Sequence, residues 1–304
     1  MTKPLSLVTG AAGFIGSNLT DYLIKQGHQV ICVDNESAEC NDKFYWNSKA
    51  WNVKADITDY KSMKNVFTDV EYVFHLAAES RLQPAINNPI DAVYKNCVGT
   101  TTMLQCAREV GVKRFVYSST SSGYGNNPYP NIEDQPDDCL NPYSASKVAA
   151  EKFCKMYSNL YGLETVVLRY FNVFGERSPT RGHYAPVIGI FQKQKDAGEP
   201  ITIVGDGSQR RDFIYVRDVA RANYIASITP LKKNGHDYTG EVFNVGSGKN
   251  YSIQEIADAI SDNQIYIDRR GGEMDTTFAD ISRIGSVMGW KPEIDVIDWI
   301  NGQE

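Results

Sequence analysis

A glycine-rich turn near the start of the chain is the feature that most restricts what the sequence can fold into. The turn runs Gly10-Ala11-Ala12-Gly13-Phe14-Ile15-Gly16. The apolar run 5–9 before it has the character of a buried strand, and the segment 14–26 has the spacing of an amphipathic helix. Glycines at a strand-to-helix junction let the chain turn tightly and let backbone amides approach a phosphate group. The turn therefore predicts a βα unit whose loop can hold a pyrophosphate.

A carboxylate after the next strand indicates which dinucleotide the turn would hold. The glycine spacing of three and three differs from the commonest dinucleotide fingerprint, but the turn has the context that the fingerprint needs. Asp34 follows the predicted strand 29–33, 18 residues beyond Gly16. A carboxylate there accepts hydrogen bonds from ribose hydroxyls and repels a 2′-phosphate, and no arginine stands at position 34 or 35. We therefore predict that the cofactor is NAD rather than NADP.

Strand-like and helical patterns continue to alternate along the chain. Strands are predicted at 5–9, 29–33, 72–75, 114–118, 165–169 and 242–245, and helices at 14–26, 90–110, 142–161 and 217–227. In the segment 90–110, apolar side chains fall near one helical face, namely Ile90, Val93, Cys97, Leu104 and Ala107. The alternation predicts an α/β fold with a doubly wound parallel sheet.

A richer loop composition after about residue 174 predicts a smaller second α/β lobe. We expect residues 1–173 plus about 211–246 to form the cofactor-binding domain. We expect about 174–210 plus 247–304 to form the substrate-binding lobe.

Composition and charge narrow the classes of function. The 304 residues are 42% apolar and 22% charged, which is ordinary for a globular protein with one large core or two domains. The formal net charge of −6 argues against nucleic-acid binding, which usually needs a basic surface. No apolar stretch has the length of a membrane span, so we expect no signal peptide, no membrane partner and a cytoplasmic location.

The cysteines and histidines show no ligand spacing. The six cysteines contain no Cys-x2-Cys pair, and three of them lie in apolar or helical patterns, at positions 32, 97 and 106. Reduced, buried thiols are therefore expected. The four histidines are far apart in the sequence, so we expect no metal site.

Tyr143 and Lys147 stand four residues apart within one predicted helix. Asn141 suits the cap of this helix and Pro142 suits its first turn, so the phenol and the ammonium lie on one helical face. A free tyrosine has a pKa of about 10, and a neighbouring positive charge favours its phenolate. The spacing alone is common on solvated helix faces, but beside the glycine turn and Asp34 it predicts a general acid/base pair.

With these features together, the chain resembles the extended short-chain dehydrogenase/reductase family, and within it the nucleotide-sugar 4-epimerases. The family has a Rossmann fold, and the resemblance runs almost from end to end. The further segments that carry it are Asp56-Ile57, His75-Leu76-Ala77-Ala78, Asn96-Cys97-Val98-Gly99-Thr100, Ser118-Ser119-Thr120, Tyr170-Phe171-Asn172, Arg211-Asp212-Phe213-Ile214 and Arg270-Gly271-Gly272-Glu273.

The resemblance implies a role for each matching position. Tyr143 would be the acid/base, Lys147 would tune it and bind the nicotinamide ribose, and Thr120 would bond the reacting sugar oxygen. The NAD-binding residues would be Gly10, Gly13, Phe14, Ile15, Gly16, Asp34, Asn35, Asp56, Ile57, Leu76, Ala77, Ala78, Asn96, Ser118, Tyr143, Lys147 and Tyr170. The substrate-binding residues would be Arg81, Thr120, Ser121, Tyr143, Asn172, Tyr184, Ala185, Val187, Arg211, Arg270 and Glu273. A homodimer is also implied.

Some of these positions have structural alternatives. Asn96 could cap or bridge helices, and Asp56 could begin a turn. Arg211 could pair with Asp206 or Asp212 at the surface, where ion pairs contribute little. Within the family, the arginines at 211 and 270 would clamp a diphosphate.

The two positions after Thr120 narrow the reaction that the resemblance implies. Sugar dehydratases of this family carry carboxylates there, and related decarboxylases keep a glutamate at the second position. This chain has Ser121 and Ser122, which cannot easily act as an acid or a base. Elimination of water should therefore be disabled, whereas reversible oxidation at C4 of the sugar remains. Gly123 replaces a branched residue of the family, which we expect to loosen this loop.

The identity of the sugar is left open. The segment 181–187 is similar to epimerases that handle UDP-N-acetylhexosamines, and Thr277 would leave room for an acetamido group. UDP-glucuronate remains an alternative, since Arg81 or Arg181 could meet a carboxylate. The alternatives in other classes are another nucleotide-sugar oxidoreductase or dehydratase, and a non-catalytic NAD-binding regulatory protein.

Overall fold

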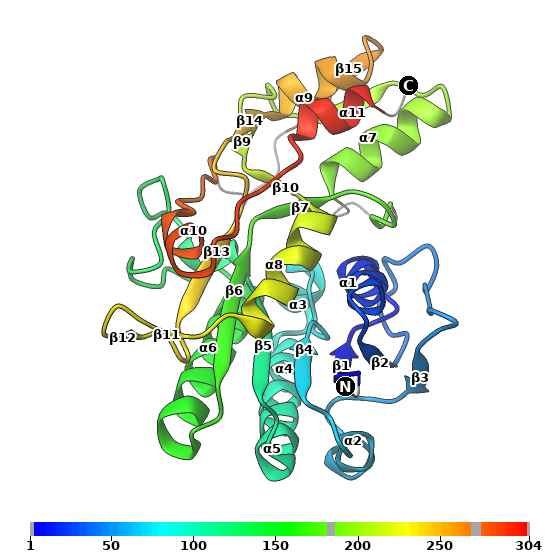
Figure 1. Cartoon of the computed structure of the whole chain (residues 1–304). Helices are drawn as coiled ribbons and strands as arrows, with labels where there is room; N and C mark the ends of the chain where they lie inside the picture. The colour runs from blue at the N-terminus through cyan, green and yellow to red at the C-terminus, as the bar shows by residue number, and fades with distance from the viewer. Residues whose placement is uncertain (1–2, 181–185, 269–274, 303–304) are drawn as a thin grey trace.

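The sheet that organises the molecule has seven parallel strands. The computed structural model describes residues 3–180, 186–268 and 275–302. The strands lie in the order β13-β6-β5-β4-β1-β2-β3 (Figure 1). Their bounds are β1 Leu5–Thr9, β2 Gln29–Asp34, β3 Trp51–Lys54, β4 Tyr72–His75, β5 Arg114–Thr120, β6 Thr165–Tyr170 and β13 Val242–Val245. Because β1 lies between β2 and β4, the winding direction reverses beside it, and ligands of such sheets bind at this point.

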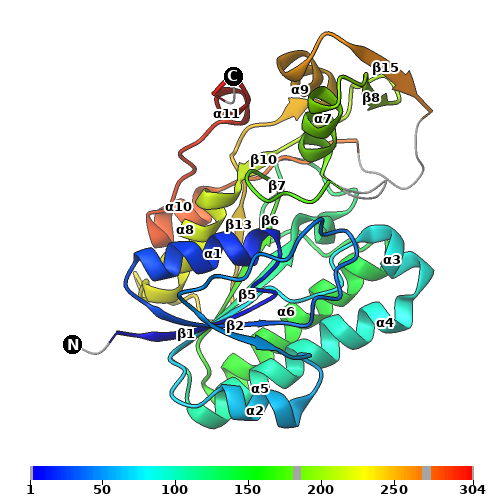
Figure 2. The same ribbon diagram turned by 90° about the vertical axis from the view of Figure 1, so that its right-hand side faces the viewer.

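Helices cover both faces of this sheet, which confirms the predicted doubly wound α/β fold (Figure 2). One face carries α1 (Phe14–Lys25), α8 (Val216–Ile228) and α10 (Ser282–Met288), and these helices share one apolar core with the strands. The other face carries α2 (Tyr60–Val66), α5 (Thr100–Val110) and α6 (Pro142–Tyr161) around a second core. The strands are apolar on both sides for this reason, as parallel strands between helices must be.

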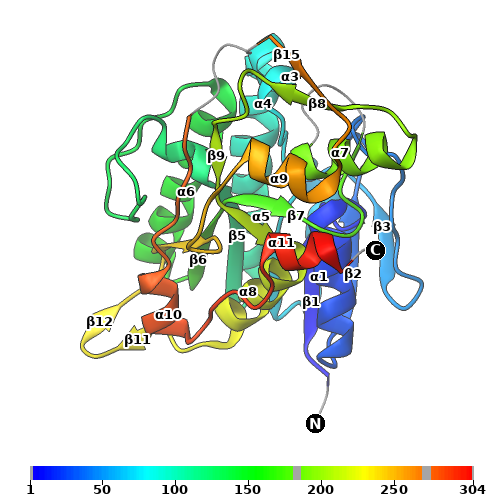
Figure 3. The same ribbon diagram turned by 90° about the horizontal axis from the view of Figure 1, so that it is seen from above.

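A smaller set of elements lies above the carboxyl ends of the strands (Figures 1 and 3). Its helices are α7 (Val187–Asp196), α9 (Ile253–Ile260) and α11 (Val296–Asn301), and its paired strands are β7 (Asn172–Phe174) with β10 (Phe213–Tyr215), β8 (Ile201–Val204) with β15 (Gln264–Ile267), and β9 (Arg210–Arg211) with β14 (Tyr251–Ser252). These elements enclose a third apolar core. Helix α10 falls in the range expected for the smaller lobe, but it packs on the large sheet through Ile284, Val287 and Met288. A separate hairpin joins β11 (Lys232–Lys233) to β12 (His236–Asp237).

The helix predicted at 142–161 is confirmed with its cap. The side chain of Asn141 accepts a 2.9 Å hydrogen bond from the backbone N–H of Ser144, and Pro142 occupies the first turn. The helix ends where Gly162 adopts a left-handed conformation, with φ of 72°. These local signals fix the direction in which Tyr143 and Lys147 leave the helix.

The single helix predicted at 90–110 is wrong in its detail. The segment consists of α4 (Pro89–Val93), a π-helical turn η1 (Tyr94–Gly99) and α5, and a further short helix, α3 (Leu82–Asn87), precedes it. Ile90 is 82% exposed and Val93 is 46% exposed, whereas Leu104 and Ala107 are buried. A π-helical turn inserts an extra residue and so rotates the faces before and after it. The apolar residues on its two sides therefore do not share one buried face.

Two further properties concern membrane-spanning helices and the state of the cysteines. Across residues 3–180, 186–268 and 275–302, none of the helices has the length and apolar character needed to cross a membrane. All six cysteines are free, and Cys32, Cys106 and Cys154 are buried. Of the three cysteines expected to be buried, Cys32 and Cys106 are, whereas Cys97 is only partly buried.

Candidate active site

A cavity of about 350 Å³ opens along the carboxyl ends of the central strands. It brings together most of the residues predicted to bind NAD, although they come from segments far apart in the sequence. Those that line it are Gly10, Gly13, Phe14, Ile15, Gly16, Asp34, Asn35, Asp56, Ile57, Leu76, Ala77, Ala78, Ser118, Tyr143, Lys147 and Tyr170. Thr120 and Arg81 line the same cavity, so the predicted catalytic group and the predicted cofactor residues share one space.

The glycine turn is shaped to leave room for a ligand. A Cβ atom added at Gly16 would lie 2.1 Å from the carbonyl oxygen of Gly10, and one added at Gly10 would lie 2.9 Å from the backbone nitrogen of Ala77. Gly10 also has a φ of 66°, a conformation that side chains other than glycine disfavour. The backbone here packs too closely for any side chain, which is the arrangement that a pyrophosphate at a helix N-terminus requires. The turn therefore fits NAD.

Asp34 lies at the end of β2, at the edge of the cavity. Its carboxylate accepts hydrogen bonds from the backbone N–H groups of Ala12, at 3.0 Å, and Glu36, at 2.8 Å. Burial raises the pKa of Asp34 above its ordinary value, while these hydrogen bonds act to lower it. The side chain is thus fixed in place at the lining of the cavity.

Two predicted cofactor residues also have the structural roles that the sequence left open. Asp56 lines the cavity and also begins a turn, since it accepts 2.8 and 2.7 Å hydrogen bonds from the backbone and hydroxyl of Thr58. Asn96 is buried, and its amide nitrogen donates to the carbonyl of Glu79 at 3.0 Å and to Ser146 Oγ at 2.9 Å. Asn96 is not among the residues that line the cavity, so it bridges the 79–81 segment and helix α6 from behind.

Of the predicted catalytic side chains, Thr120 and Lys147 are buried and Tyr143 is partly buried, and Tyr143 forms a hydrogen bond with Thr120. Burial raises the pKa of Tyr143 above its ordinary value of 10.0, whereas a hydrogen bond with Thr120 and the charge of Arg81 act to lower it. Burial lowers the pKa of Lys147 to about 8. Its ammonium lies 4.3 Å from the centre of the Tyr117 ring. Arg81 is thus a cation whose charge favours the Tyr143 phenolate, and the same effect of Lys147 stays a prediction.

The serines after Thr120 form a short 3-10 helix, η2 (Ser121–Tyr124). Thr120 Oγ1 accepts a 3.1 Å hydrogen bond from the backbone N–H of Ser122 and contacts the Ser122 hydroxyl at 3.1 Å. No carboxylate from these two positions points at the reacting oxygen, because both side chains are hydroxyls. Ser121 is buried and is not among the residues that line the cavity.

The expectation that Gly123 loosens this loop is wrong. A Cβ atom added at Gly123 would lie 2.7 Å from Val148 Cγ2 on helix α6. Glycine is needed here because η2 and α6 approach each other so closely. Gly123 therefore tightens the packing of the loop that follows Thr120 against the helix that carries Tyr143.

The predicted substrate residues differ in how the structure places them. Asn172 is not among the residues that line the cavity, and its amide nitrogen donates to the Asp212 carbonyl and to Thr277 Oγ1, both at 2.9 Å. Its contact with the substrate stays a prediction. Thr277 is only 4% exposed and is not among the residues that line the cavity, so its part in leaving room for an acetamido group stays a prediction.

The remaining predicted substrate residues lie away from the lining of the cavity or cannot be placed. Arg211 donates to the carbonyls of Arg210 and Asp275 and to Gln209 Oε1. Val187 begins helix α7, and its neighbour Pro186 lines the cavity in its place. Tyr184, Ala185, Arg270 and Glu273 lie outside the described residues, as does Arg181.

The cavity also includes residues that the sequence did not reveal. Lys95 lines it and forms a 2.7 Å ion pair with Asp91. The loop after β2 contributes Ser37, Ala38, Cys40 and Asn41, and a second loop contributes Pro179. Loop residues of this kind have no periodic pattern, so their approach to the site is visible only in the fold.

Comparisons with known proteins agree with this geometry. Residues 6–246 match the model of the NAD dependent epimerase/dehydratase family. A UDP-glucuronate 4-epimerase of Thermodesulfobacterium geofontis is 36% identical over 95% of this chain and 92% of the relative.

Two solved structures are similar over almost the whole chain. The UDP-glucose 4-epimerase of Thermotoga maritima, solved with UDP-glucose, has a TM-score of 0.90 and 32% identity over 98% of this chain and 96% of that one. The UDP-N-acetylglucosamine 4-epimerase of Methanobrevibacter ruminantium, solved with UDP-N-acetylmuramic acid, has a TM-score of 0.88 and 31% identity over the full length of both chains. Together with the site described above, these matches establish that the chain belongs to the NAD-dependent epimerase/dehydratase family.

Proposed function

We propose that the protein is an isomerase that inverts C4 of a nucleotide-diphosphate sugar with NAD as its cofactor. The observation that carries this function is the group of Tyr143, Lys147 and Thr120 at one cavity with the glycine turn, followed by serines rather than carboxylates. The three side chains suit removal and return of a hydroxyl proton. The two serines leave no group at those positions for eliminating water.

The chain's own residues would act in the following way. Tyr143 Oη, as phenolate, takes the proton from the 4-hydroxyl of the sugar, and Thr120 bonds the same oxygen. When bound, NAD supplies reversible hydride exchange with C4. The resulting 4-keto sugar turns about its phosphate linkage and presents its opposite face. Tyr143 then returns the proton, so that C4 is inverted with no net oxidation.

A UDP-sugar is the substrate class we propose, with glucose/galactose or N-acetylglucosamine/N-acetylgalactosamine as the sugar. UDP-glucuronate is the second candidate because Arg81 lines the cavity that contains Tyr143, where a guanidinium could meet a carboxylate. Further predicted contacts, at Arg270, Glu273, Tyr184 and Ala185, lie outside the described residues. For each of these residues, the assignment to cofactor or substrate binding is a proposal.

The test is to incubate the purified protein with UDP-glucose, UDP-N-acetylglucosamine or UDP-glucuronate, without added cofactor, and to identify the products by NMR. We expect the C4 epimer of at least one sugar. A 4-keto-6-deoxy product would show that the protein is a dehydratase and would contradict the proposed epimerisation. The Tyr143→Phe variant should lose nearly all activity and keep its bound NAD, and full activity in this variant would remove Tyr143 from the reaction.

The alternative function without catalysis is that of an NAD-binding regulatory protein. Proteins of that class need the glycine turn and Asp34 but have no use for the buried acid/base group. NAD binding without turnover of any nucleotide sugar would favour it over the isomerase.

We also propose a homodimer through the exposed apolar faces of two neighbouring helical segments. Ile90, Tyr94 and Val98 are exposed along α4 and η1, and Met156 and Leu160 are exposed on α6, which contacts both. An apolar surface of this kind on a monomer marks an interaction site. Sedimentation should show a dimer that Ile90→Lys converts to a monomer, whereas Ile228→Lys, at an exposed residue on α8, should leave it a dimer. A monomeric wild-type protein would exclude this dimer.

Two further predictions concern location and domain organisation. A cytoplasmic location agrees with six free cysteines, which a reducing compartment maintains, and cell fractionation would test it.

We also propose that residues 1–173 plus about 211–246 hold NAD, while the remaining segments hold the nucleotide sugar. Limited proteolysis with and without each ligand would test the division, because each ligand should protect its own segments.

A further inference from the structure

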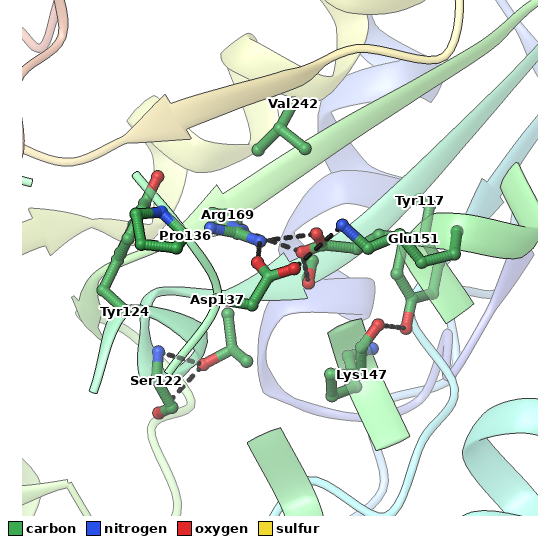
Figure 4. Close-up of polar contacts among 12 residues, drawn as sticks. Tyr117, Ser122, Tyr124, Pro136, Asp137, Lys147, Glu151, Arg169 and Val242 are labelled. Atoms are coloured by element: carbon green, nitrogen blue, oxygen red, sulfur yellow. Dashed lines mark hydrogen bonds and ion pairs between the residues drawn. The ribbon is translucent and has the colours of Figure 1, made fainter. Parts of the chain in front are cut away.

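A buried ion-pair network lies one helical turn behind the catalytic lysine. Arg169, on β6, is 2% exposed and bonds Glu151 of helix α6 through Nε at 2.9 Å and through Nη2 at 2.7 Å. Nη2 also donates to Asp137 Oδ1 at 2.7 Å. Figure 4 shows Arg169 between these two carboxylates, with Lys147 and Tyr117 farther along α6 and β5.

Three of the contacts reach segments that carry the catalytic group. Ser119 donates to Glu151 Oε1 at 2.5 Å, and Ser119 directly precedes Thr120 on β5. Glu151 follows Lys147 by four residues on α6, so the two side chains leave the same helical face. Asp137, in the loop before α6, forms a second ion pair of 2.8 Å with Lys152. The network therefore ties β5, β6, helix α6 and the loop before it at one point.

The loop after Thr120 packs on the same network. The guanidinium carbon of Arg169 lies 4.6 Å from the centre of the Tyr124 ring at the end of η2. A Cβ atom at Gly123 would lie 3.7 Å from this guanidinium. A displaced Arg169 would thus disturb both sides of the site, the strand that ends at Thr120 and the helix that carries Tyr143.

Glu151 is also the one anionic neighbour of Lys147 in the described part of the chain. The other titratable groups that face this ammonium are Cys97 of η1, Cys154 of α6, Tyr117 of β5 and His75 of β4. Burial raises the pKa of both thiols and of Tyr117, and lowers that of His75 to about 3, so all four are neutral at pH 7. The charge of Glu151 opposes the loss of the Lys147 proton.

We propose that Glu151, held by Arg169 and Ser119, is a positioning residue that sets helix α6 against strand β5 and keeps Lys147 charged. Glu151 is not among the residues that line the cavity. Its effect on turnover rests on the epimerase reaction proposed above, but its effect on Lys147 does not. The geometry explains why Arg169 and Glu151 are buried together beside the partly exposed Asp137, although burying charges is costly unless each is paired.

The first experiment measures Lys147 directly and needs no turnover. In protein labelled with ¹³C at lysine Cε, the Lys147 signal is assigned by its loss in Lys147→Met and is followed against pH by NMR. Glu151→Gln removes the negative charge, so the ammonium is less favoured and the pKa of Lys147 should fall by roughly one unit. An unchanged Lys147 titration in folded Glu151→Gln would overturn the electrostatic half of the role.

The matched control lies at the other end of the same strand. Arg114, also buried, bonds Glu164 through Nε at 3.1 Å and Nη2 at 2.7 Å, but it is the first residue of β5 whereas Thr120 is the last. Glu164→Gln should therefore leave the Lys147 titration and kcat as in the wild type. A shift of the same size in Glu164→Gln would show a general loss of packing and would also overturn the assignment to Glu151.

The second experiment measures turnover. In Glu151→Gln, kcat should fall about tenfold with KM within about twofold, since the substrate contacts are untouched. The alkaline limb of the kcat profile should move to lower pH together with the lysine titration. If Glu151→Gln does not fold, Ser119→Ala, which removes a single hydrogen bond, decides the matter: a several-fold lower kcat at unchanged KM supports positioning, and wild-type kcat overturns it. A wild-type protein without any turnover would instead contradict the proposed function.

Discussion

Thr277 Oγ1 accepts a 2.9 Å hydrogen bond from Nδ2 of Asn172 and a 3.1 Å hydrogen bond from the backbone N–H of Asp212. One hydroxyl thus connects the 275–280 segment to both β7 and the strand that leads to β10. Because the Asn172 amide nitrogen is committed to Asp212 and Thr277, its Oδ1 keeps a single orientation. The hydroxyl of Thr277 therefore fixes the orientation of Asn172, a residue that we predict to bind the substrate.

Thr277→Val should separate this role from simple packing. Valine has nearly the shape of threonine but leaves the buried N–H of Asp212 and one partly buried N–H of Asn172 without an acceptor, which should lower the free energy of unfolding by about 1–3 kcal/mol. We also expect a higher KM for the nucleotide sugar, because Asn172 can then rotate. Urea denaturation and steady-state kinetics measure the two effects. Thr277→Ser keeps the hydroxyl and should restore both, so equal behaviour of the two variants would contradict this role.

Gly16→Ala should damage the cofactor turn. The added methyl group would lie 2.1 Å from the Gly10 carbonyl oxygen and 2.8 Å from its carbon, and backbone atoms cannot move aside as a flexible side chain can. We expect a loss of about 1–3 kcal/mol in unfolding free energy from overpacking and a clear loss of bound NAD. Calorimetry and measurement of NAD released on denaturation would check both.

The control for the glycine turn is a glycine with space around it. At Gly285, within helix α10, the nearest atom to an added Cβ is the Trp290 carbonyl oxygen at 3.6 Å, which is an ordinary contact. Gly285→Ala should stabilise the protein by roughly 0.5–1 kcal/mol because alanine favours helices, and NAD binding should not change. Equal NAD content in Gly16→Ala and Gly285→Ala would contradict the steric explanation.

Local signals account for the part of the fold that could be predicted from the sequence. The glycine turn, the Asn141 cap and the apolar strands act over a few residues, and the structure has the helices and strands that they predict. Strand β3 was missed because it is an edge strand with little apolar burial, and Trp51 at its start is 58% exposed. The π-helical turn was missed because it depends on packing against α6 rather than on a sequence pattern.

The site divides in a similar way between local and tertiary determinants. Residue types and order predicted which side chains line the cavity, such as Asp34 and Tyr143. They did not predict which side-chain atoms form hydrogen bonds within the protein. Examples are the amide nitrogens of Asn96 and Asn172, which donate to Ser146 and Thr277. The contact of Gly123 with Val148 is likewise made between segments that only the fold brings together. Hydrogen-bond partners across such distances carry no periodic signal.

Asp34→Asn should weaken the preference for NAD. The two oxygens of Asp34 accept from Ala12 and Glu36, so an asparagine can keep one of these bonds and remain in place while the negative charge is lost. Repulsion of a 2′-phosphate then disappears, and the ratio of NADP to NAD affinity should rise roughly tenfold. Calorimetric titration of both dinucleotides measures the ratio. Asp59→Asn, at the exposed cap of α2, is the control, and a ratio unchanged in both variants would remove Asp34 from cofactor selection.

His75 should make the protein lose stability in mild acid. Its ring is buried between Thr9 and Thr100, which it contacts at 2.7 and 3.0 Å, and burial, with the charge of Lys147, lowers its pKa from 6.5 to about 3. Between these two values the unfolded chain binds a proton that the folded protein excludes. This contribution to stability is therefore complete above pH 6.5 and is lost as the pH falls, by roughly 1.4 kcal/mol for each pH unit.

Urea denaturation at several pH values between 4 and 7 would measure this slope. His75→Gln should be less stable at pH 7, because a buried ring is lost, but its unfolding free energy should depend less on pH. Some dependence should remain, since burial also lowers the pKa of His28. His236 is exposed on the β11–β12 hairpin, so His236→Gln should keep the wild-type slope. A wild-type slope in His75→Gln would show that acid destabilisation arises from other groups, and that His75 is protonated in the folded protein as readily as in the unfolded chain.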